Sequence, residues 1–497
     1  MLGWCLPGLL LAITLRIVLM WQMPMAVYHD DSPDFLTTPD RLLFEHRFEL
    51  HSKKTFLTPI LFSVPFLLHV PALITIPVFQ HVLGLLVVLM VGLLCRLWFT
   101  HWKLFIVPLT VIAAADPFML WYEHTIMAET LFLFCTLTVA VAGTLYALKQ
   151  SPARFYFLCL ALFLTAGARP EGKLLFGFGI VFVAFLHFRT FRESWPRLAA
   201  MILLALTTHL LTATSQAGLL LYTSVARLTP HDLKCAPGFE PYIAPIRADL
   251  QRRWDEKPSF PKVNDRRAIA EAVRLYLRTN VDAKRAKHSG VNDFCLKLAK
   301  ETCRKNLLHL PVHAYEKFRF SANDSPSGLL DDEWLFSRQY AAYNDESGRA
   351  VRLSRGLTGI TLNAEADFEQ FVDTHYVESH WFNSLAEHWL AFVDAWRLPD
   401  AVYPDLEKPS KPFVYHGIPV YFLLGAAGLI AVAFRRGPVQ PFHIIWALTL
   451  FGFFFTIMLT ANIRPRFRFV FEPFWFLYIA LLIETICLGI QASFRRP

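Results

Sequence analysis

Charged residues are scarce in this sequence, and a basic surface with interleaved aromatic residues is missing. Only 18% of the 497 residues are Asp, Glu, Lys or Arg, whereas 55% are hydrophobic. So little charge excludes an ordinary soluble enzyme. The missing basic surface argues against nucleic-acid binding. Internal repeats and low-complexity tracts are absent as well, and the composition predicts an integral membrane protein.

The apolar residues are concentrated in runs long enough to cross a bilayer, which takes about 20 residues per helix. These runs are residues 3–24, 72–95, 104–121, 127–147, 155–168, 174–190, 197–222, 413–434, 440–460 and 468–490. The expected fold class is therefore α, a polytopic transmembrane bundle of about ten helices. Residues 56–71 are also apolar, but prolines interrupt them, which is typical of an interfacial or re-entrant segment.

The basic residues of the short loops predict the orientation in the membrane. Lys and Arg recur in alternate connections, at 96–103, 149–154, 189–197, 435–436 and 495–496. The positive-inside rule places these connections in the cytoplasm. The remaining connections then face outward, and they are 25–55, 122–126, 169–173, 223–412 and 461–467.

The sequence divides into three parts. Residues 1–222 form an N-terminal transmembrane module whose first outer loop is 25–55, and residues 413–497 hold the last transmembrane helices. Residues 223–412 are polar, with acidic and basic residues in near balance, and apolar residues recur there at helical spacing. We expect these residues to form a mostly helical extracytoplasmic domain.

An acidic pair follows the first predicted span directly. Asp30 and Asp31 stand at the start of the first outer loop, and Asp34 comes three residues later. Carboxylates at a membrane surface can act as a general base, as metal ligands or as both. The alternative is a solvated loop with a turn at Ser32-Pro33.

Two groups of cations on the predicted outer side break the positive-inside pattern. Guanidinium groups bind phosphate in a bidentate way, and lysines at the bilayer suit a lipid phosphate. Ordinary anchoring to lipid headgroups is the alternative, above all for the lysines. The candidate anion-binding residues of these groups are His51, Lys53 and Lys54 in the first loop and Arg464, Arg466 and Arg468 before the last span.

Several charges lie inside or at the edge of apolar helices, where each costs about 2.5–3.5 kcal/mol at mid-bilayer. Glu129, shortly after Glu123 and His124, should face the bundle interior and meet a cation or a metal. A helix-start acid favoured by the dipole is the alternative. These three residues are candidates for the site.

Two arginines also need acidic partners. Arg169 stands in a polar turn between short spans, where it either binds substrate or pairs with Glu171. Arg16 lies in the middle of the first span, and its expected partner is Asp116 or an acid of an outer loop.

In the order of these features the chain resembles the GT-C glycosyltransferases, which use polyprenyl- or dolichyl-phosphate sugars, and within them the protein mannosyltransferase and aminoarabinose transferase type. The resemblance covers residues 1–220 and 413–490. The features that carry it are Arg16, Asp30-Asp31, Thr58-Pro59, Pro117, Ala128-Glu129-Thr130-Leu131-Phe132, Ala168-Arg169-Pro170-Glu171-Gly172 and Arg464-Pro465-Arg466-Phe467.

The resemblance implies an inverting transfer of a sugar from a polyprenyl-phosphate donor to an acceptor hydroxyl of a lipid, glycan or protein. Asp30 or Asp31 would be the catalytic base, and Glu129 would orient the acceptor or help Asp31 to hold a divalent cation such as Mg²⁺ or Mn²⁺. Some relatives need no metal. Relatives often carry Asp-Glu followed by a Tyr, whereas Asp-Asp is followed by Phe35 here, so the choice between the two acids stays open.

Three other functions remain as alternatives. They are a glycan ligase of similar architecture, a transporter or flippase with charges along its pathway, and an assembly protein. A transporter is disfavoured by the lack of repeated halves and by the long polar domain. We expect the protein in a bacterial inner membrane, with its site facing the periplasm.

Overall fold

The computed structural model describes most of the chain. Its described residues are 2–27, 32–47, 54–188, 191–211, 217–256, 263–281, 288–314, 349–363, 380–394, 401–403, 413–415, 420–433, 439–460 and 472–494, together with 367, 370, 371 and 374. Seven candidate residues fall outside these ranges, namely Asp30, Asp31, His51, Lys53, Arg464, Arg466 and Arg468.

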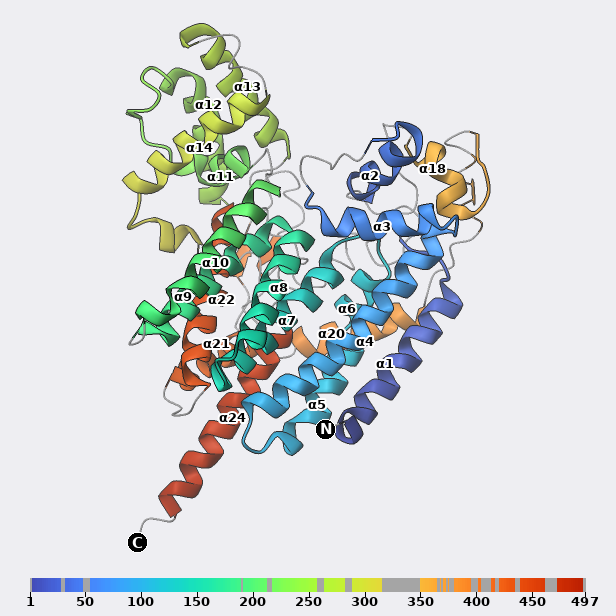
Figure 1. The fold of residues 1–497 in the computed structure, drawn as a ribbon. Coiled ribbons are helices and arrows are strands. Elements are labelled where there is room, and N and C mark those ends of the chain that lie inside the picture. The colour runs from blue at the N-terminus through green and yellow to red at the C-terminus, as the bar shows by residue number, and fades with distance from the viewer. Residues whose placement is uncertain are drawn as a thin grey trace.

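The fold is a bundle of α-helices, as the apolar runs predict (Figure 1). Four helices in the described part are long and apolar enough to cross a membrane, and there are five if a bent pair of helices counts as one span. The four are α1 (Leu2–Gln22), α4 (Ala72–Trp98), α7 (Glu129–Leu148) and α24 (Glu472–Phe494). The chain is therefore an integral membrane protein.

Further helices pack around these four. The bounds of those in the bundle are α3 (Leu57–Leu67), α8 (Pro152–Ala168), α9 (Leu174–Leu186), α10 (Phe191–Leu211), α21 (Val420–Ala433) and α22 (Gln440–Thr460). The segment that three prolines interrupt is thus a helix, α3, of 11 residues. Its length is well below the roughly 20 residues that a span requires.

One predicted span is broken. The run 104–121 forms α5 (Trp102–Ala115) and α6 (Pro117–Glu123), which meet at an angle of 50°. Asp116 adopts an extended conformation, which a residue before proline prefers, and its carboxylate accepts a hydrogen bond from the Phe118 amide at 2.9 Å. The same dipeptide therefore ends one helix and begins the next.

Two other predicted spans differ from the observed elements. The run 197–222 is divided between α10 and α11 (Ala217–Val225). The start of the run 413–434 is a short strand, β2 (Phe413–Tyr415), which pairs antiparallel with β1 (Ala401–Tyr403) before α21 begins. Valine and aromatic residues in both strands favour this pairing over a helix.

The polar helices after α11 form a unit with its own core. They are α12 (Glu240–Glu256), α13 (Val263–Asn280) and α14 (His288–Lys305), and their buried residues cluster separately from those of the bundle. Tyr222 of α11 and Phe239 lie at the centre of this second core. The helical spacing of apolar residues within 223–412 predicts helices there, and α13 and α14 are two of them.

Figure 1 shows the two ends of the bundle. The N-terminal end of α1 and the C-terminal end of α24 lie at one end. The short helices α2 (Ser32–Phe44) and α3 lie at the other end, and the unit of α12 to α14 is on that same side. Asp34, which belongs to α2, therefore lies at the end opposite the termini.

Candidate functional site

The first outer loop is attached to the segment that precedes α7. Val27 donates its amide to the His124 carbonyl at 2.8 Å and accepts from the Ile126 amide at 3.1 Å. Ser32 donates its hydroxyl to the Ile126 carbonyl at 3.1 Å. The acidic pair Asp30-Asp31 stands in the sequence between these two attached residues.

Glu129 is the first residue of α7, and its side chain is buried, as predicted. Its Oε1 accepts a hydrogen bond from Arg169 Nη1 at 2.7 Å, while Arg169 Nε also lies 3.2 Å from Glu171 Oε2. Both partners expected for Arg169 and Glu129 are thus present. Neither Glu129 Oε2 nor the hydroxyl of Thr130 has a hydrogen-bond partner among the described residues. Buried acceptors without donors are rare, so one more donor or a cation is expected at the Glu129 carboxylate.

The beginning of α3 contacts the residue before Arg169. Thr58 donates its hydroxyl to the carbonyl of Ala168 at 3.1 Å, next to Arg169. In the same turn of chain, Lys54 Nζ lies 3.7 Å from Asp34 Oδ2 and 4.0 Å from the centre of the Phe35 ring. Lys54 and Asp34 are therefore part of the same end of the bundle.

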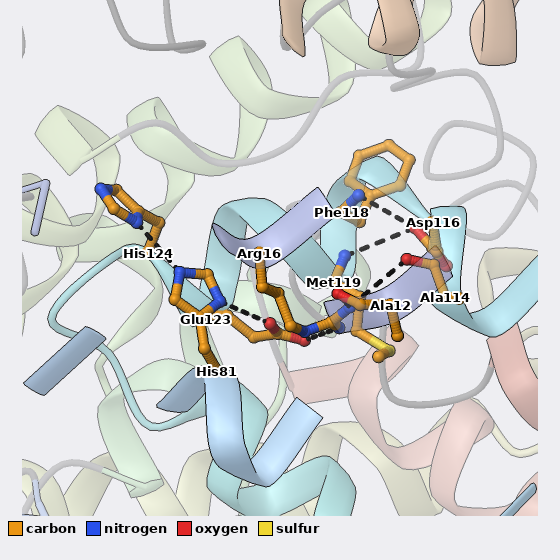
Figure 2. Close-up of polar contacts among 9 residues, drawn as sticks. All are labelled: Ala12, Arg16, His81, Ala114, Asp116, Phe118, Met119, Glu123 and His124. Carbon is orange, nitrogen blue, oxygen red and sulfur yellow. Dashed lines mark hydrogen bonds and ion pairs between the residues drawn. The ribbon is translucent and has the colours of Figure 1, made fainter. Parts of the chain in front are cut away.

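Four more polar side chains form a buried row behind this end (Figure 2). Arg16 Nη2 lies 2.5 Å from Glu123 Oε1, and Glu123 Oε2 lies 2.7 Å from His81 Nδ1. His81 Nε2 in turn lies 3.2 Å from His124 Nδ1. Of the two expected kinds of partner for Arg16, an acid of a predicted outer connection is the one observed, because Glu123 of 122–126 takes the guanidinium while Asp116 caps α6.

The sequence reasoning missed His81 and its neighbour Gln80. Both are buried on α4, where Gln80 donates its amide to the Thr125 carbonyl at 2.6 Å. A signal was present, since Gln80-His81 is a polar pair inside the largely apolar helix α4. Such residues in a span face the protein interior and need partners.

The described residues contain no group of three or more His, Cys, Asp or Glu side chains that could hold a metal ion. Asp31, one of the two expected ligands, lies outside the described residues. The other, Glu129, has one oxygen on Arg169 and one without a donor, so it fits as a single ligand of a divalent cation. The expected Mg²⁺ or Mn²⁺ therefore stays a prediction.

No family model and no curated protein matches the sequence. Among solved structures, the chain is similar to the archaeal oligosaccharyltransferase AglB from Archaeoglobus fulgidus in complex with an inhibitory peptide and a dolichol-phosphate, with 12% identity and a TM-score of 0.40 over 99% of this chain and 51% of that chain. It is also similar to ArnT from Cupriavidus metallidurans bound to undecaprenyl phosphate, with 12% identity and a TM-score of 0.32 over 91% of this chain and 76% of that chain. The chain thus spans about half the length of the AglB chain. Likenesses at this level do not carry an argument about activity.

Proposed function

We propose that the protein is an inverting membrane glycosyltransferase, which moves a sugar from a polyprenyl-phosphate donor to an acceptor hydroxyl. The observation that carries the proposal is the convergence of three distant segments. Val27 and Ser32, on either side of the acidic pair, are both bonded to 124–126, which leads directly into Glu129 and its partner Arg169.

The acidic pair supplies the base in this proposal. Asp30 or Asp31 removes the proton of the acceptor hydroxyl as its oxygen attacks the anomeric carbon of the donor sugar. A new carbon–oxygen bond forms on the face opposite the phosphate, and the bond to the phosphate oxygen breaks. The polyprenyl phosphate departs with the electron pair, so the transfer proceeds with inversion and needs no redox partner.

Cations of the same loops receive the leaving phosphate. Lys54 is placed at this end of the bundle, and the sequence adds Lys53, Arg466 and Arg468 as further candidates. Positive groups fixed near a developing charge stabilise the transition state in a site from which water is excluded. A bilayer edge provides such exclusion for a lipid-linked donor.

Glu129 has a different role from the acidic pair. Its Oε1 is occupied by Arg169, and its buried Oε2 has no donor among the described residues. We assign it the orientation of the acceptor hydroxyl, which would donate to Oε2, or the second ligand position of a cation shared with Asp31. The Arg169 contact holds the carboxylate in place for either task.

A turnover assay tests this proposal. The purified protein in lipid nanodiscs is incubated with labelled polyprenyl-phosphate sugars, and release of polyprenyl phosphate is measured for wild type, Asp30→Asn, Asp31→Asn and Glu129→Gln. We expect one Asp variant to lose most activity. Glu271→Gln is the matched control, because Glu271 is 63% exposed on α13, away from the proposed residues.

Two outcomes would contradict the proposal. If both Asp30→Asn and Asp31→Asn turn over the donor as fast as wild type, neither residue is the catalytic base. Absence of turnover in wild type with every donor and acceptor class, combined with movement of labelled lipid across the bilayer, would favour a flippase. The sidedness is tested separately with Thr100→Cys and Asn462→Cys, which must react with an impermeant thiol reagent from opposite sides.

A further inference from the structure

The site proposed above is supported from behind by side chains that are themselves closed off from solvent. His124 Nε2 lies 2.9 Å from the Met25 carbonyl, two residues before the bridge between Val27 and Thr125. Gln80 donates to the carbonyl of Thr125 at 2.6 Å. His124, after α6, and Gln80 of α4 thus hold the two backbone segments that form this bridge.

The fixing contacts continue inward to Arg16. His81, 5% exposed, joins His124 to Glu123, and Glu123, fully buried, joins His81 to Arg16. The guanidinium is also held by the carbonyl of Ala12 at 3.1 Å. The row, whose four side chains are drawn in Figure 2, therefore connects the interior of α1 to the Met25 carbonyl at the start of the first outer loop.

Gly84 of α4 makes room for this row. A Cβ atom at this position would lie 1.9 Å from Glu123 Oε1 and 2.3 Å from the carboxyl carbon. Such contacts do not occur between real atoms, so the carboxylate can occupy its place between Arg16 and His81 only because residue 84 has no side chain. The arrangement therefore depends on a residue that carries no polar group.

We infer that Arg16, Glu123, His81 and His124 are positioning residues for the first outer loop, rather than groups that contact substrate. Glu123 and His124 are fully buried, so they act through Met25, Val27 and the 124–126 segment. The inference rests on the proposed function for its catalytic consequence. A displacement of about 1 Å in a catalytic group can reduce a rate about 100-fold, which gives such a support a measurable effect.

The structural half of the test needs no substrate. Hydrogen exchange of the peptides 23–27 and 124–127 is compared between wild type and His124→Leu in nanodiscs. Loss of the Met25 contact should raise exchange there and leave α12 to α14 unchanged. His124→Gln, whose amide can donate to the same carbonyl, should restore protection. His187→Leu is the matched control, since His187 is a buried histidine bonded to Tyr146 at 2.7 Å in another part of the bundle.

The kinetic half uses the donor turnover assay. His124→Leu should lower kcat by about 100-fold with KM for the donor within a factor of about three, and His124→Gln should recover most of the loss. Gly84→Ala tests the same row without removing a polar group, and it should lower kcat in the same way. Its matched control is Gly177→Ala on α9, where an added Cβ meets no atom within 4 Å.

The outcomes separate this inference from the proposed function. If His124→Leu and Gly84→Ala leave the exchange of 23–27 unchanged, the positioning role is wrong, whatever the enzyme does. If KM rises and kcat is unchanged, His124 contacts substrate and the inference is also overturned. If wild type turns over no donor while the exchange result is as expected, the glycosyltransferase proposal fails and the structural support of the loop stands.

Discussion

The buried contact between Arg16 and Glu123 predicts a large loss in the free energy of unfolding when one partner is removed. The two side chains are 4% and 0% exposed, and their closest atoms lie 2.5 Å apart. Arg16→Met would leave the Glu123 carboxylate buried with only His81 beside it. Breaking a buried ion pair by removing one partner costs about 3–5 kcal/mol, because the remaining charge has lost its compensation.

The pair should behave differently when both charges are removed. Replacing a buried ion pair by apolar side chains of similar volume is often close to neutral. Arg16→Met/Glu123→Met should therefore be less destabilised than the sum of the single variants by at least about 2 kcal/mol. The free energy of unfolding is measured by titrating the folded protein in mixed micelles with SDS, for wild type, both single variants and the double variant.

An exposed pair of the same kind serves as the matched control. Arg274 and Glu271 on α13 lie 3.2 Å apart, but they are 35% and 63% exposed. Their double-mutant cycle should give a coupling energy of at most about 1 kcal/mol. If the single-variant costs at Arg16 and Glu123 simply add, the two groups are not coupled and the row described above does not exist as a unit.

Three further predictions concern other parts of the molecule. Burial opposes ionisation of Glu301, but hydrogen bonds from Cys235 and from the Lys234 and Cys235 amides outweigh it and lower the pKa of Glu301 to about 2. The stability that this carboxylate contributes is therefore present above pH about 4.5 and lost as the pH falls towards 2. The protection factors of α14, which correct for the pH dependence of intrinsic amide exchange, should therefore fall over that pH range, and Glu301→Gln should remove this fall. Gly428→Ala should lower the stability by about 1–3 kcal/mol in the SDS titration, because the added Cβ would lie 2.0 Å from the Tyr478 carbonyl oxygen of α24. Asp116→Ala should cost about 1 kcal/mol in the same titration through loss of the α6 cap, whereas Asp116→Asn should retain most of the stability.

The positions of most helices could be predicted from the sequence, because a lipid environment imposes a minimum length of apolar residues on each span. The runs at 72–95 and 127–147 correspond closely to α4 and α7. The break at Asp116-Pro117 could not be located from hydropathy, since the residues on both sides are equally apolar. It follows instead from local backbone chemistry, in which a proline and a capping carboxylate favour a new helix start.

In the candidate site, too, the sequence predicts some contacts of single residues and not others. Glu129 could be expected to meet a cation because an acid at the start of a span is costly without one, and Arg169 is that cation. The choice between the candidate acids for Arg16 could not be made in this way, because Glu123 is 107 residues away and Asp116 was an equally suitable acid by type. Hydropathy identifies which side chains require a partner, whereas packing decides which partner is within reach. At Glu123 that decision depends on Gly84, whose missing side chain is invisible to any argument from charge. A residue that contributes only space thus leaves the Glu123 carboxylate its place between Arg16 and His81, and His81 and His124 connect that place to the Met25 carbonyl at the start of the first outer loop.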